Sequence, residues 1–191
     1  TPHTIRPCNR NGLNLRCCLV AIIQPATFMV KYSQFRLKEN NDPMASPPQH
    51  ASKYARLTLK NIATHNLGDK ISLGGAFGLL HYLDYRPTYD VDAWWAVDIA
   101  SADQEAVLSV IEDTFAQFGQ VKRRSWGDVT SIELHQDQKA VFSFQIAHRS
   151  SQLQPSITAE WADILVDSLA DIVPSKMVAL VEGGATRNSR D

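Results

Sequence analysis

The sequence predicts an α/β (α+β) protein in which a mixed β-sheet is flanked by helices. Segments with helical spacing of apolar residues alternate with strand-like segments, and three strand-like segments separated by short turns then follow one another. The chain has 191 residues, 44% of them hydrophobic and 20% charged, which suits one domain with a buried core and excludes wholesale disorder. Three cysteines cannot form a disulfide framework, and no apolar run approaches the roughly 20 residues that span a bilayer.

Residues 1–43 differ in composition from the rest of the chain. They hold all three cysteines and six of the 19 basic and two of the 20 acidic residues, which leaves 13 basic and 18 acidic residues, a net charge of −5, for 44–191. We expect 1–43 to be a disordered or non-native N-terminal extension, with Met44 as the functional start and 44–191 as the domain. The alternative is a signal peptide with its apolar segment at 17–23, but that segment is short and no clear cleavage site follows it.

The elements of the domain follow from local spacing and from turn residues. Apolar residues recur at intervals of three and four over 102–118, and Gly119 ends that helix. Short turns rich in Gly, Asp and Gln separate three strands that should form an antiparallel meander. The expected order is a helix at 51–66, a strand at 70–73, a helix at 76–83, a strand at 89–99, a helix at 102–118, strands at 120–126, 129–134, 140–147 and 164–166, and a helix at 174–182 with Pro174 in its first turn.

Two features of this pattern suggest chemistry. Asp90 and Asp92 alternate with apolar residues in a strand, so both carboxylates should project from one face, where their mutual repulsion favours a bound cation. Mg²⁺ is bound in this way by a pair of carboxylates together with phosphate oxygens and water. Gly74 and Gly75 precede a helix, where open backbone N–H groups suit an anion. Each feature alone is weak, but their order and spacing together predict a site for a nucleoside triphosphate with its metal.

The same residues carry a resemblance to the nucleotidyltransferase superfamily, specifically to the AbiEii/AbiGii toxin family. It extends over 44–191 and rests on two motifs about eighty residues apart. The first motif is matched by Gly74, Gly75, Arg86, Thr88, Asp90 and Asp92, and the second by Asp171, Lys176, Ala179, Leu180, Arg187 and Asp191.

The resemblance implies a nucleotidyltransferase-like fold and an enzyme that transfers NMP from an NTP to an RNA (such as tRNA) or protein acceptor. It further implies the toxin component of a toxin–antitoxin (abortive infection) system, which acts in the cytoplasm, has a cognate antitoxin and makes no membrane contact. The residue roles that it implies are Mg²⁺ binding by Asp90 and Asp92, catalysis by these two with Lys176 and Asp191, and nucleotide binding by Gly74, Gly75, Arg86, Thr88 and Lys176.

The chain also departs from the family pattern. Gly183 stands where the family usually has arginine, Asn188 stands where it has aspartate, and the sequence ends at Asp191 where relatives continue. We therefore expect a C-terminally truncated domain with impaired activity. The alternative is a non-catalytic remnant of the fold that binds a nucleotide or a protein partner. Glu133 is the candidate for a third metal carboxylate. Trp94 and Trp95 flank the acidic pair, and one of them could stack on a base, although Trp95 alternates with Val97 and is more typical of the core.

Overall fold

The structure is a computed structural model that describes residues 47–149, 151–159 and 161–183. All of them lie in the compact unit Asp42–Asp191. The expected extension at 1–43 lies outside the described residues. Across the described ranges, no helix has both the length and the apolar stretch needed to cross a bilayer.

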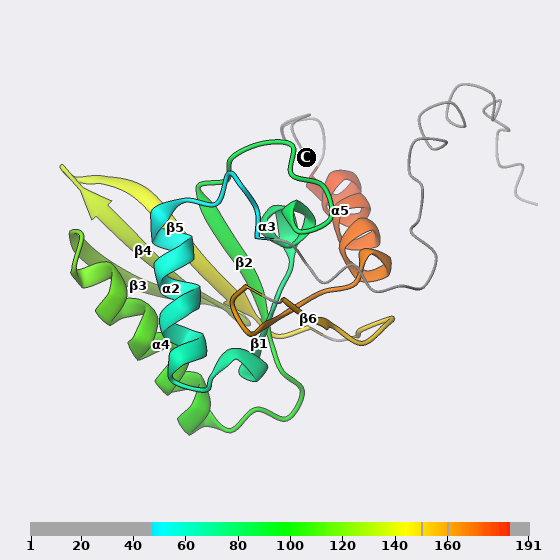
Figure 1. Cartoon of the computed structure of the whole chain (residues 1–191), viewed down its shortest axis with the longest axis horizontal. Coiled ribbons are helices and arrows are strands. Elements are labelled where there is room, and N and C mark those ends of the chain that lie inside the picture. Colours follow the sequence, from blue (N-terminus) through cyan, green and yellow to red (C-terminus); the bar gives the residue numbers. More distant parts are fainter. Residues whose placement is uncertain (1–46, 150, 160, 184–191) are drawn as a thin grey trace, which may run out of the picture. The chain divides into compact units, whose positions relative to one another are not determined.

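Seven strands form one mixed sheet, which confirms the predicted fold class. They are β1 (Ile71–Leu73), β2 (Asp90–Trp95), β3 (Gln120–Trp126), β4 (Val129–Gln136), β5 (Lys139–Ala147), β6 (Ile157–Ala159) and β7 (Ile164–Val166). Their order is β3-β4-β5-β2-β1-β7-β6 (Figure 1). β3, β4 and β5 form the predicted antiparallel meander, whereas β2 pairs with β5 and β1 with β7 in parallel. The two parallel pairs place β1 and β2 in the middle of the sheet.

The helices are α2 (Lys53–Thr64), α3 (Gly75–Leu80), α4 (Ser101–Ala116) and α5 (Leu169–Gly183), with a short 3₁₀ turn at Gly68–Lys70. α2 and α4 lie side by side against the sheet (Figure 1). Tyr54 of α2 and Phe115 of α4 both contact Phe142 of β5, with ring centroids 5.6 and 5.7 Å apart. This pair of helices therefore covers one face of the sheet, while α3 and α5 pack against each other.

Alternation along β2 assigns its two faces as predicted. Val91 and Ala93 are 0% and 3% exposed and belong to the core, whereas Asp90 and Asp92 are half-buried on the opposite face. The strand ends at Trp95 instead of continuing to residue 99, because Asp98 adopts a left-handed φ of 58° in a turn. The acidic pair thus lies on the face that α2 and α4 leave uncovered.

The segment after β5 departs from the prediction in two ways. The short strand β6 was not expected, and α5 starts at Leu169, so Pro174 lies beyond the first turn where it was placed. The earlier start has a local cause, since Ser168 caps the helix: the Asp171 N–H donates to Ser168 Oγ at 3.2 Å. Ser168 Oγ in turn donates to Asp171 Oδ2 at 2.6 Å, which orients the capping side chain.

Candidate active site

A pocket of about 510 Å³ opens beside the acidic pair. Five of the eight residues predicted for the site line it: Gly75, Arg86, Asp90, Asp92 and Lys176. They come from the start of α3, the loop before β2, β2 itself and α5. Residues a hundred positions apart in the sequence are therefore brought to one concave surface of a size typical of ligand sites, which are about 300–1,000 Å³.

The acidic pair is positioned by the pairing of β2 with β5. β2 runs parallel to β5, with Asp90 opposite Ser143 and Asp92 opposite Gln145. Two residues along a strand correspond to a rise of about 6.6 Å, and both side chains leave the same face. Gln145 also lines the pocket, which the sequence did not indicate because the pairing of β2 with β5 is not evident from local spacing.

The two glycines have different roles in the packing. Gly75 has a φ of +55°, and a Cβ there would lie 2.7 Å from Asp92 Cβ and Cγ. Gly74 is extended, and a Cβ there would lie 2.5 Å from Trp94 Nε1. The Gly74 N–H donates to the Asp92 carbonyl at 2.9 Å. The Gly-Gly step is thus required by the β2 side chains that pack onto it, and α3, at six residues, is too short to add a strong helix dipole.

Two cationic side chains reach the pocket from outside the sheet. Arg86 lies in the loop before β2, where its guanidinium carbon is 5.6 Å from the centre of the Tyr85 ring. Lys176 is half-buried on α5. Arginine and lysine are positively charged at neutral pH, so the pocket combines two carboxylates with two cations.

Three predicted site residues are not placed at the pocket. Thr88 is 3% exposed and does not line it, and its Oγ1 is buried with no hydrogen-bond partner in the described part of the chain. Gly74 is buried beneath Trp94 and likewise does not line it. Asp191 lies outside the described residues, together with Arg187 and Asn188 of the same motif.

Glu133, the candidate third carboxylate, has partners of its own. It faces Ser143 across β4 and β5, and Ser143 faces Asp90, so Glu133 lies on the same sheet face but two strands away from the acidic pair. Its Oε2 lies 2.8 Å from His135 Nε2 and 3.6 Å from Arg124. Among the residues that the structure describes, no group of three or more His, Cys, Asp or Glu side chains is placed to hold a metal ion.

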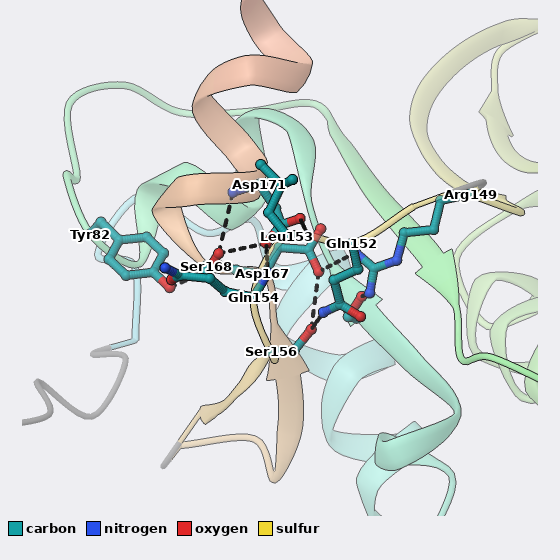
Figure 2. A network of polar contacts seen from close by, with 10 residues as sticks. Tyr82, Arg149, Gln152, Leu153, Gln154, Ser156, Asp167, Ser168 and Asp171 are labelled. Carbon is teal, nitrogen blue, oxygen red and sulfur yellow. Dashed lines mark hydrogen bonds and ion pairs between the residues drawn. The ribbon is translucent and has the colours of Figure 1, made fainter.

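A polar network lies at the ends of β1 and β7 (Figure 2). Arg149 donates to Asp167 Oδ1 at 2.9 Å and to Ser72 Oγ at 3.2 Å, and Ser156 donates to the same Asp167 oxygen. The Asp167 side chain is only 2% exposed and that of Arg149 is 13% exposed. This buried ion pair is not evident from the sequence, because Arg149 follows β5 and Asp167 follows β7, and only the strand order β5-β2-β1-β7 brings the two together.

Asp171, which matches the second family motif, belongs to this network. It accepts hydrogen bonds from the backbone N–H groups of Leu153 and Gln154 and from Ser168. Partial burial raises the pKa of Asp171, but these hydrogen bonds and the charge of Arg149 outweigh it, so the net effect is a lowered pKa. In this structure, Asp171 therefore fixes the loop before β6 and holds the side chain of Ser168, which caps α5.

Tyr82 and His81 make buried polar contacts near the same network. The Tyr82 hydroxyl donates to the Asp167 carbonyl at 2.8 Å, and burial together with the charges of Asp167 and Asp171 raises the Tyr82 pKa to about 12. Trp161 donates to His81 Nε2 at 3.2 Å, which leaves Nδ1 as the donor to the Phe77 carbonyl. Burial lowers the pKa of His81, so the neutral ring is the structural form.

Comparisons with known proteins add little beyond this geometry. No protein-family model matches the chain, and no curated protein matches it. Among solved structures, the chain is similar to a protein of Thermotoga maritima that is provisionally described as a nucleotidyltransferase. The two sequences are 15% identical, the match covers 63% of this chain and 85% of that chain, and the TM-score is 0.35. Similarity at that level carries no argument about function, and membership of the AbiEii family stays a prediction.

Proposed function

We propose that this protein is a metal-dependent nucleotidyltransferase that transfers a nucleoside monophosphate from an NTP to an acceptor. An acceptor oxygen would form a bond to the α-phosphorus, the bond between that phosphorus and the bridging oxygen would break, and pyrophosphate would leave. The observation that supports the proposal is the convergence of Asp90 and Asp92 with Arg86 and Lys176 around one pocket. Two carboxylates for a cation and two cations for phosphates are the charge pattern that a metal–triphosphate complex needs.

The residues present fit a Mg²⁺ ion. Asp90 and Asp92 supply two carboxylates from one strand face, both of them in the wall of the pocket. Two protein carboxylates are a usual complement for Mg²⁺, with water and phosphate oxygens as the other ligands. Bound there, the ion would neutralise phosphate charge and orient the triphosphate.

The remaining polar groups have distinct roles in this proposal. Lys176 would act as a point charge on the triphosphate, and Arg86 would bind phosphate oxygens through its planar guanidinium. Both groups would stabilise negative charge that moves toward the leaving pyrophosphate. Asp191 would orient or deprotonate the acceptor, a role that rests on the family resemblance alone. The acceptor, RNA or protein, and the role as a toxin with a cognate antitoxin also rest on that resemblance.

The second candidate function is nucleotide binding without transfer. It is favoured by the finding that, over the described ranges, neither Glu133 nor any other His, Cys, Asp or Glu joins Asp90 and Asp92 as a third metal-binding side chain. It is also favoured by the sequence departures at Gly183 and Asn188.

One set of measurements separates the two candidates. Thermal unfolding is recorded with each NTP, with and without Mg²⁺, for the wild type, Asp90→Asn and Asp92→Asn, with the exposed Asp113→Asn as matched control. We expect Mg²⁺-dependent protection in the wild type and the control and its loss in the two site variants. Transfer of label from α-labelled NTP to a cellular acceptor then establishes the transferase. Protection against thermal unfolding without transfer of label supports the nucleotide-binding protein. No protection in the wild type refutes both candidate functions.

A further inference from the structure

A second pocket of about 520 Å³ adjoins the first. The two pockets share Trp94 and Ser175 in their walls, so the indole of β2 and the serine of α5 separate them. The second pocket lies over the network of Arg149, Asp167 and Asp171 (Figure 2). A ligand longer than one pocket could therefore extend past Trp94 from one to the other.

The two pockets differ in charge. Arg86 and Lys176 line the first, where a divalent ion would offset the acidic pair. The charged groups of the second are one guanidinium, Arg149, and two carboxylates, Asp167 and Asp171. The pKa of Asp171 is lowered despite its partial burial, because hydrogen bonds and Arg149 stabilise its ionised form. A polyphosphate is therefore favoured in the first pocket and repelled by the second.

The walls of the second pocket suit a planar ring. Trp94, Leu153, Pro174 and Val178 supply apolar surface around a polar floor. Of the five N–H groups of an arginine, Arg149 uses one on Asp167 and one on Ser72, and its Nε has no hydrogen-bond partner in the part of the chain described. The Arg149–Asp167 ion pair holds this floor rigid. An uncharged ring with apolar faces and a hydrogen-bonding edge, such as a nucleobase, matches such a pocket.

We propose that the second pocket binds the nucleobase of the nucleotide whose triphosphate lies in the first pocket. The inference rests on the proposed function and adds to it a second contact surface, with Trp94 between base and phosphates. Base selection would then come from the residues around Arg149, and the polyphosphate would be bound without regard to the base.

The test compares a complete nucleotide with its polyphosphate part alone. Calorimetric titration with Mg²⁺ measures the affinity for each of the four NTPs and for inorganic tripolyphosphate. Val178→Trp places a bulky side chain in the second pocket from a position that is already 53% exposed. Val181→Trp, on the same helix and 82% exposed, is the matched control that does not line the pocket. Leu153→Trp, at a position 67% exposed, places a bulky side chain in the same pocket from the segment between β5 and β6, should the first variant not fold.

We expect Val178→Trp to weaken binding of the preferred NTP about tenfold or more, the scale of one lost base-stacking contact, and to leave tripolyphosphate binding unchanged. Equal losses for NTP and tripolyphosphate, or no loss for either, would overturn the inference. A wild type that binds tripolyphosphate as tightly as any NTP would overturn it as well, while leaving the proposed phosphate and metal site intact. A wild type that binds neither ligand would instead refute the proposed function.

Discussion

The close contact between Gly75 and Asp92 allows a sharp test of the site. Gly75→Ala adds a Cβ that would lie 2.7 Å from Asp92 Cβ and Cγ, in a backbone conformation with a φ of +55°. A left-handed φ costs an alanine about 1–2 kcal/mol. Displacing Asp92 from its rotamer costs about 0.5–1.5 kcal/mol more. We therefore expect Gly75→Ala to lower the free energy of unfolding by about 1.5–3.5 kcal/mol.

The control separates backbone strain from contact with the site. Gly127, in the turn between β3 and β4, has nearly the same φ of +53°, but a Cβ there would meet nothing within 4 Å. Gly127→Ala should therefore cost only the backbone part, about 1–2 kcal/mol. Urea unfolding of both variants measures the difference, which isolates the displacement of Asp92.

The same two variants report on function through ligand-linked stability. With an NTP and Mg²⁺ at a hundredfold excess over Kd, the wild type and Gly127→Ala should gain about 2.7 kcal/mol. Displacement of Asp92 by Gly75→Ala should weaken the affinity at least tenfold, which lowers that gain by about 1.4 kcal/mol. Equal unfolding energies for the two variants, together with an unchanged ligand gain in Gly75→Ala, would refute the assignment of Asp92 to the site.

Three further predictions concern the polar groups around the site. Arg149→Met leaves Asp167 buried without its guanidinium and should lower the free energy of unfolding in urea by about 3–5 kcal/mol. The control Arg123→Met breaks a surface ion pair with Glu105 and should lower it much less. Similar losses in the two variants would contradict the buried role of Arg149. Because the pKa of His81 is lowered in the folded protein, the unfolded chain binds a proton more readily, so stability should be full above pH 6.5 and fall as the pH drops below it. Urea unfolding at a series of pH values measures this dependence of stability on pH, which His81→Gln should flatten. An unchanged pH dependence in His81→Gln would exclude His81 as its source. Asp171→Asn weakens the hydrogen bonds from the carboxylate to the 153–154 loop and to Ser168, and should lower stability by about 1–2 kcal/mol in the same assay. An unchanged stability would contradict the role of Asp171 in holding that loop.

Features of the fold with a local cause could be predicted from the sequence. The alternation of Asp90 and Asp92 with Val91 and Ala93 specified both faces of β2, because side chains in a strand alternate without regard to the rest of the fold. The long helix α4 was placed within a few residues by its apolar spacing and its terminal glycine. The meander was predicted for the same reason, since its strands are linked by short turns.

The predicted start of α5 was wrong, and features that depend on pairing between distant strands were missed. Pro174 suggested the start of α5, yet the spacing Ser168-x-x-Asp171 already contained a capping signal one turn earlier. β6 is a three-residue edge strand with no alternation to detect. The Arg149–Asp167 pair and the wall formed by Gln145 depend on which strands pair in parallel, and that is decided by the whole sheet.

The packing of the Gly-Gly step changes what that motif can be taken to indicate. Gly74 lies under Trp94 and Gly75 under Asp92, so the strand pattern Asp-x-Trp requires two residues without side chains at this point, whether or not a phosphate binds. A Gly-Gly step before a helix is therefore explained by sheet packing alone, and it supports a nucleotide site only indirectly, by setting the position of Asp92 and of the Trp94 partition. The charge pattern that favours nucleotide chemistry is the presence of Arg86 and Lys176 in the same pocket as the acidic pair, and the packing of the two glycines does not account for it.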